Sequence, residues 1–163
     1  MKKTMKKNVI VILCTAFLVT CKDMGTGTQY PTQGISEDHS DIADPYARWQ
    51  AYHLTSYVID EQHSCFCAYG GEVCRVCVRD NKVIDVIKKS DGTSIFAQMP
   101  QTFKTVDELF ALASSINPDS VASVVIQYDA RFGFPKLISV NPRLQIADEE
   151  YAYYTQNIER LVY

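Results

Sequence analysis

The first twenty-one residues constrain this chain most, because they determine the compartment in which the rest of it folds. Lys2 to Lys7 form a cationic segment, and Val9–Val19 (VIVILCTAFLV) is an apolar run that ends just before Cys21. A cationic start followed by a short apolar run is typical of a secretory signal peptide, and this run is too short to span a bilayer comfortably. We therefore expect residues 1–20 to be a signal peptide and the remainder to fold outside the cytoplasm.

The four residues that end this segment, Leu18-Val19-Thr20-Cys21, resemble the lipobox of bacterial lipoproteins. Thr20 departs from the usual Gly, Ala or Ser, although it is small and uncharged. The resemblance implies cleavage before Cys21 and acylation of that cysteine, and two or more acyl chains give stable anchoring. We expect an exported, membrane-anchored lipoprotein on the periplasmic face or cell surface. The alternative is an uncleaved N-terminal anchor in which Cys21 is an ordinary thiol.

The charge of the chain is divided between this segment and the rest. The full sequence carries −3, but four lysines and no acidic residue precede Cys21, so the remainder has 12 basic and 19 acidic residues, a net charge of −7. An acidic domain is repelled by nucleic-acid phosphates, and we expect no nucleic-acid partner. Residues 21–44 are rich in Gly, Thr, Gln, Ser and Asp and predict a flexible tether, which leaves residues 45–163 as a single domain.

Two helices are predicted from their capping signals. Asp44 followed by Pro45 is a typical helix start, and this helix is expected to run to Leu54 with Trp49 as a packing anchor. Thr105 with Glu108 three residues later forms a capping box that opens an amphipathic helix ending at Ile116.

Segments rich in β-branched and aromatic residues predict the strands. Asp80-Asn81 between two of these segments predicts a tight hairpin. We expect an α+β fold, with an antiparallel sheet of five or six strands and both helices packed on one face. The predicted strands are 57–66, 73–79, 83–88, 121–128, 136–140 and, with an ambiguous helix-like spacing of apolar residues, 151–163.

Four cysteines of the domain form a Cys-x-Cys and a Cys-x-x-Cys motif, at Cys65, Cys67, Cys74 and Cys77. Disulfides are the default in an oxidising compartment. The short connection between the two motifs could place Cys67 opposite Cys74, but three pairings exist and the sequence does not choose between them. The alternatives are a structural zinc site with four thiolate ligands, or free, redox-active thiols.

No catalytic motif is evident. The sequence has no G-x-S-x-G, phosphate loop, H-E-x-x-H or EF-hand pattern, and His53 and His63 have no Ser or Cys partner in a recognisable motif. We expect no catalytic residues, no enzymatic activity, no cofactor and no resident metal apart from the zinc alternative. The loop between two predicted strands is the candidate binding loop, with Tyr128, Asp129, Phe132, Gly133, Phe134 and Pro135.

Several short segments together resemble a family of bacterial envelope proteins, the uncharacterised domain-of-unknown-function family 6174. The resemblance covers Pro45 to Ile158, and Cys74 and Cys77 depart from the expected pattern. It implies a secreted or lipid-anchored domain and no known activity. The segments are Trp49, Tyr57, Cys65-Phe66-Cys67, the Val76–Val83 hairpin, Thr105–Phe110, Tyr128-Asp129, Gly133–Pro135 and Ala147–Glu150.

The sequence thus favours a lipid-anchored envelope protein that acts as a non-enzymatic binding or interaction module, with the membrane and an envelope protein as partners. A thiol-active or zinc-dependent protein that uses the four cysteines is the first alternative. An inhibitor-like protein is the second, by analogy of fold alone.

Overall fold

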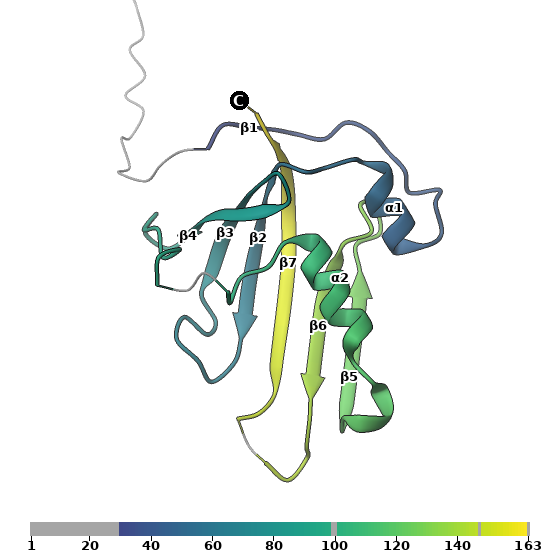
Figure 1. Ribbon diagram of the computed structural model, residues 1–163, viewed down its shortest axis with the longest axis vertical. Helices are drawn as coiled ribbons and strands as arrows, with labels where there is room; N and C mark the ends of the chain where they lie inside the picture. The colour runs from purple at the N-terminus through teal and green to yellow at the C-terminus, as the bar shows by residue number, and fades with distance from the viewer. Residues whose placement is uncertain (1–29, 99–100, 147, 163) are drawn as a thin grey trace, which may run out of the picture.

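A computed structural model describes residues 30–98, 101–146 and 148–162 (Figure 1). The predicted signal peptide, Cys21 and residues 21–29 lie outside the described residues. Within the described part of the chain, no helix is long and apolar enough to cross a membrane.

The strands form one antiparallel sheet in the order β4-β3-β2-β7-β6-β5, and the short strand β1 pairs with β7 (Figure 1). The predicted antiparallel sheet with two helices is therefore confirmed. The sheet has seven strands where five or six were expected, because β1 lies in a segment assigned to the tether. The strands are β1 (Thr32–Gln33), β2 (Tyr57–Ser64), β3 (Val73–Arg79), β4 (Lys82–Lys88), β5 (Ser123–Tyr128), β6 (Pro135–Asn141) and β7 (Tyr151–Leu161).

Both helices begin where their capping signals place them. In α1 (Pro45–Ala51) the Asp44 side chain accepts a hydrogen bond from the Ala47 amide, and in α2 (Val106–Ser115) both halves of the capping box are present. The first helix ends three residues before the predicted Leu54, because His53 adopts a positive φ of 49° and turns the chain. A short 3-10 helix, Pro118–Ser120, follows α2.

Most of the buried apolar residues lie in two clusters that join residues of the helices with residues of the sheet. Trp49 of α1 packs edge-on against Tyr57 of β2, with ring centroids 5.4 Å apart, and its indole N–H donates to Asp107 in the first turn of α2. Leu109 and Ala113 of α2 pack with Ile138 of β6 in a second buried cluster. The ambiguous last segment is strand β7, as predicted, and it pairs with β2 over most of its length.

Residues 30–44 pack against the domain, which corrects the tether prediction for this part of the chain. Thr32 and Gln33 pair with the end of β7, and Ile35 is buried. Arg131 donates to the Ile35 and Glu37 carbonyls. A polar composition hid this segment from sequence reasoning, since backbone pairing and polar side-chain contacts attach it, among them the hydrogen bond of Tyr30 to Asp85 and the ion pair of Glu37 with Arg160. The tether prediction now concerns residues 21–29 alone.

Gly133 fixes the contact between the β5–β6 loop and α1, and replacing it with alanine should destabilise the domain. Its φ is +85°, and an added Cβ would lie 2.2 Å from the Pro45 carbonyl oxygen. We expect Gly133→Ala to lower the free energy of unfolding by about 2–3 kcal/mol in urea denaturation. Gly92→Ala is the matched control, because Gly92 has a φ of +74° but open space around its Cβ position. It should cost only about 1 kcal/mol, and equal losses would contradict the steric argument.

Candidate functional site: a polar cavity on the sheet and a cysteine pair at the end of β2

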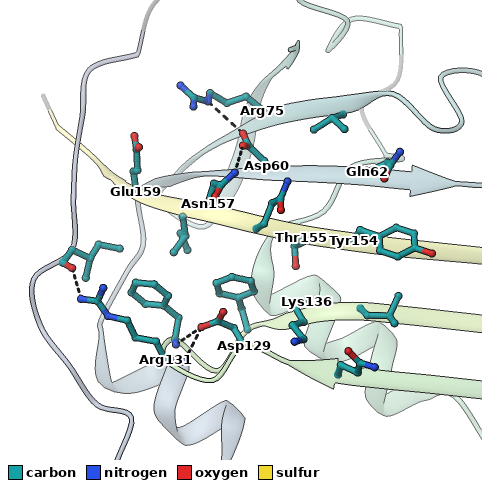
Figure 2. Close-up of a pocket in the computed structure, with 18 of the residues that line it drawn as sticks. Asp60, Gln62, Arg75, Asp129, Arg131, Lys136, Tyr154, Thr155, Asn157 and Glu159 are labelled. Carbon is teal, nitrogen blue, oxygen red and sulfur yellow. Dashed lines mark hydrogen bonds and ion pairs between the residues drawn. The ribbon is translucent and has the colours of Figure 1, made fainter. Parts of the chain in front are cut away.

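A cavity of about 1090 Å³ opens on the face of the sheet opposite α2 (Figure 2). Its floor is formed by β2, β3, β7 and β6, and its walls by the β5–β6 loop and by Gly34 and Ile35 of the N-terminal segment. The cavity is thus built from segments far apart in the sequence. Its volume lies just above the range of about 300–1,000 Å³ that is typical of small-molecule sites.

Asp60 forms the charged part of the floor. Its side chain is 1% exposed, and Lys89 Nζ lies 2.5 Å and Arg75 Nε 3.6 Å from its carboxylate oxygens. Asn157 Nδ2 donates to the same carboxylate at 3.0 Å. Asn157 lies in a bulge of β7 with φ 56°, so this hydrogen bond ties the bulge to β2 (Figure 2). The buried charge is therefore compensated from three sides.

Other polar groups along the cavity are left open to a ligand. Tyr154 of β7 is 45% exposed, and Gln127, Lys136 and Gln156 are also exposed. No hydrogen bond or ion pair of the Lys136 ammonium group is found within the described residues. Figure 2 shows Lys136 and Tyr154 on adjacent strands of the floor. An exposed ring, two amides and a cation can contact a polar ligand together.

The predicted binding loop contributes one wall of this cavity, but most of its side chains hold the fold. Asp129 accepts hydrogen bonds from the Arg131 and Phe132 amides, which closes the turn. Arg48 of α1 donates to the Asp129 and Ala130 carbonyls. The buried members of the loop are Gly133, Phe134 and Pro135, Phe132 is half-buried, and Tyr128 stacks on Phe110 away from the cavity-lining set.

The structure pairs the cysteines of the first motif with each other. The sulfur atoms of Cys65 and Cys67 lie at bonding distance, with Cα atoms 5.2 Å apart, in the turn that follows β2. Cys74 is a buried free thiol that lies opposite Glu61, so the considered pairing of Cys67 with Cys74 is not the one found.

Cys77 is also a buried free thiol, and the four sulfurs do not form one group. Cys77 lies opposite Val58 and packs in an apolar cluster with Val58 and Leu161, on the sheet face opposite Cys74. Burial raises the pKa of Cys74 and of Cys77 to about 12, so both thiols stay protonated at neutral pH. The arrangement gives no support to a zinc site with four thiolates.

His63 is the neighbour of the cysteine pair that sequence reasoning missed. Its Nδ1 lies 3.6 Å from Cys65 Sγ, and its ring stacks on Tyr153 with centroids 4.2 Å apart. Burial, and then the charge of Lys104, lower the pKa of His63. Among the described residues, the atoms of His63, Cys65 and Cys67 are the one group close enough to bind a metal ion, but the disulfide leaves no thiolate to bind it.

Glu61 is a second unexpected feature, since it is a carboxyl group in the core. Its side chain is fully buried beneath Lys104, and neither oxygen has a hydrogen-bond partner of normal geometry. Burial raises the pKa of Glu61 to about 8, although the backbone and ammonium group of Lys104 act in the opposite direction. Glu61 is therefore mostly protonated at neutral pH.

A family model described as a family of unknown function, DUF6174, matches residues 41–160, which is most of the chain. The chain belongs to this family. The match confirms the family that the sequence analysis identified by resemblance. No curated protein and no solved structure matches the chain.

The DUF6174 match includes the cavity floor and the four cysteines of the domain. It leaves out Gly34 and Ile35, which form part of the cavity wall. The family name assigns no activity, so function is argued from the site itself.

Proposed function

We propose that this chain is an exported protein, anchored by a lipid on Cys21, that acts as a non-enzymatic binding module through the cavity over Asp60. The single observation that carries the proposal is a large polar cavity whose exposed groups converge without forming a catalytic arrangement. The cationic and apolar segments before Cys21 support export. Both helices are proposed to pack on one face of the sheet, which leaves the opposite face free for the ligand.

The proposed ligand is an extended polar segment of an envelope protein that carries a carboxylate. Lys136 offers a cation that can pair with an acidic group, while the Tyr154 ring offers a surface for stacking. The amides of Gln127 and Gln156 can each donate to and accept from a peptide backbone. By contrast, Arg75 and Lys89 are already engaged with Asp60. Specificity therefore depends on Lys136, Tyr154 and the amides.

Site-specific crosslinking in intact cells tests this function. A photo-crosslinking amino acid at Gln156 should capture a discrete partner, and the same amino acid at Asp119, an exposed residue of the 3-10 helix, should not. Lys136→Glu reverses the charge that faces the ligand. When it is combined with the photo-crosslinking amino acid at position 156, Lys136→Glu should reduce the yield of the crosslinked partner about tenfold or more. This is the reduction expected for loss of a charge pair worth at least about 1.4 kcal/mol.

The crosslinking result would contradict the proposal if both positions gave the same products, or if Lys136→Glu left the yield unchanged. Lys82→Glu provides the matched control, because Lys82 is an exposed lysine of β4 outside the cavity. It changes the net charge by the same amount and should leave the yield unaltered. A difference between these two variants separates a local contact from a general effect of charge.

A further inference from the structure

The cysteine pair lies in an exposed turn apart from the cavity. Strand β2 ends at Ser64, and neither Cys65 nor Cys67 lines the cavity. Cys65 is half-buried, Cys67 is exposed, and Phe66 between them is 87% exposed. A reactant can therefore reach the sulfur of Cys67 from solvent, whereas the sulfur of Cys65 faces the protein and His63.

The turn is held in place by contacts other than the disulfide. The Gly71 amide donates to the His63 carbonyl at 2.9 Å, and the Gln62 side chain donates to the Gly71 carbonyl at 2.6 Å. Gly70 packs so closely that an added Cβ would lie 2.3 Å from the Cys65 carbonyl oxygen. These contacts can keep the two sulfurs close together after the bond between them opens.

The disulfide itself contributes little to the fold. The two cysteines are separated by two positions, and the stabilisation that a crosslink gives through the unfolded chain grows with the length of the loop it closes. A loop as short as the one between Cys65 and Cys67 therefore gives close to the smallest stabilisation that a disulfide can provide. A crosslink with little structural use, in an exposed turn that is already fixed, points to chemistry at the sulfurs.

His63 supplies the group that such chemistry needs. Its Nδ1 lies 3.6 Å from Cys65 Sγ, and stacking on Tyr153 fixes the plane of the ring. The lowered pKa of His63 favours the neutral imidazole at neutral pH, which can take up and return a proton. With its proton on Nδ1, the neutral ring can donate a hydrogen bond to Sγ of Cys65 as that sulfur leaves the disulfide, and can pass this proton to the thiolate while Nε2 takes a proton from solvent.

We propose that Cys65 and Cys67 form a thiol–disulfide exchange site that oxidises a dithiol, on a protein or a small molecule, with His63 assisting Cys65 as the leaving group. A thiolate of the dithiol attacks Sγ of Cys67, the bond between Cys65 and Cys67 breaks, and Cys65 leaves as a thiolate that receives a proton through His63. The second thiolate of the dithiol then attacks its own partner sulfur in the mixed disulfide, and Cys67 leaves and is protonated. Two electrons pass to the cysteine pair, the dithiol becomes a disulfide, and its two protons end on Cys65 and Cys67.

Cys74 and Cys77 take no part in this reaction. Both are completely buried thiols, and neither lies in the group formed by His63, Cys65 and Cys67. They therefore provide internal controls, because a reagent that acts on the folded protein should modify the pair in the turn and leave these two thiols protected.

The experiment uses the full chain with dithiothreitol as the dithiol probe at pH 7. Alkylation followed by peptide mass spectrometry, with circular dichroism to confirm folding, assigns each thiol. We expect the pair to open while Cys74 and Cys77 stay protected, and His63→Gln to slow the opening about tenfold or more. Cys74→Ala is the control that should leave the rate unchanged.

Trapping of the mixed disulfide tests the order of the two cysteines. With oxidised glutathione, Cys65→Ser should form a mixed disulfide at Cys67, and Cys67→Ser should form much less at the half-buried Cys65. The proposal is overturned if the pair resists dithiothreitol in the folded protein, if His63→Gln opens as fast as the unaltered chain, or if the two trapping variants react equally.

Discussion

Replacing Glu61 with glutamine should make the protein more stable at neutral pH, by about 3 kcal/mol at pH 7. The Glu61 carboxyl is fully buried without a hydrogen-bond partner of normal geometry, and burial raises its pKa from 4.5 to about 8. Glu61 is therefore protonated in the folded state, whereas in the unfolded chain at pH 7 it is ionised. Folding at pH 7 thus includes the free-energy cost of protonating this carboxylate. Glutamine has nearly the same shape and is neutral at every pH, so Glu61→Gln removes this cost of protonation.

The sign of the pH dependence follows from the raised pKa. Protonated Glu61 is compatible with the core, so its contribution to stability is fully present below pH 4.5 and is lost as the pH rises through about 8. We expect the stability of the unaltered protein to fall relative to that of Glu61→Gln across this window. The two proteins should be about equally stable at pH 4.5, and the gap should widen up to about pH 8.

Urea denaturation at several pH values measures this gap, because all other titrating groups are common to the two proteins and cancel in the difference. Glu150→Gln, at an exposed glutamate, is the matched control and should give a difference independent of pH. A constant gap between Glu61→Gln and the unaltered protein would show that Glu61 does not titrate over this window.

Sequence reasoning recovered the elements whose signals are local. Asp44 and Thr105 cap their helices as predicted, because a side chain that accepts from an amide three residues ahead is fixed by sequence spacing. Strand β3 matches its predicted range. The hairpin at Asp80-Asn81 also forms, with φ of 50° and 59° at the two turn residues.

The features that sequence reasoning missed depend on contacts between distant segments. Strand β1 forms because Thr32 and Gln33 pair with the backbone at the end of β7. The sequence around residue 32 does not indicate this partner. The cavity likewise joins residues from 34 to 159. One local signal was available but unused: His63 and Cys65 are two residues apart, a spacing that places side chains on the same face of a strand.

Adjacent residues of β2 also show why composition alone could not locate the site. Asp60 and Glu61 are both buried carboxyl groups, but successive side chains of a strand point to opposite faces. Asp60 meets two cations and an amide on the cavity side, whereas Glu61 meets the core. Nothing in the sequence distinguishes the two acids. The packing around β2 places Asp60 beside cations and Glu61 in the core.

Removing both cations from Asp60 should therefore be strongly destabilising. The double variant Arg75→Met and Lys89→Met leaves a carboxylate that is 1% exposed with Asn157 as its remaining side-chain partner. Breaking a fully buried ion pair costs about 3–5 kcal/mol, but Arg75 and Lys89 are 37% and 41% exposed, so solvent screens part of their attraction to Asp60. We therefore expect a loss of about 2–3 kcal/mol in urea denaturation at pH 7. Arg143→Met, which removes an exposed ion pair with Glu149, is the control and should have little effect.

A third substitution distinguishes two causes of this loss of stability, an uncompensated charge on Asp60 and the lost packing of the Arg75 and Lys89 side chains. Adding Asp60→Asn to the double variant replaces the uncompensated charge by a neutral amide of similar size, so more than half of the lost stability should return. If the cost came instead from lost packing of the long Arg75 and Lys89 side chains, Asp60→Asn would recover nothing. Recovery would also show that the charge on the cavity floor serves mainly to hold its own cations and the β7 bulge in place. Recognition of a ligand would then depend on the exposed groups of β6 and β7, Lys136 and Tyr154 first among them.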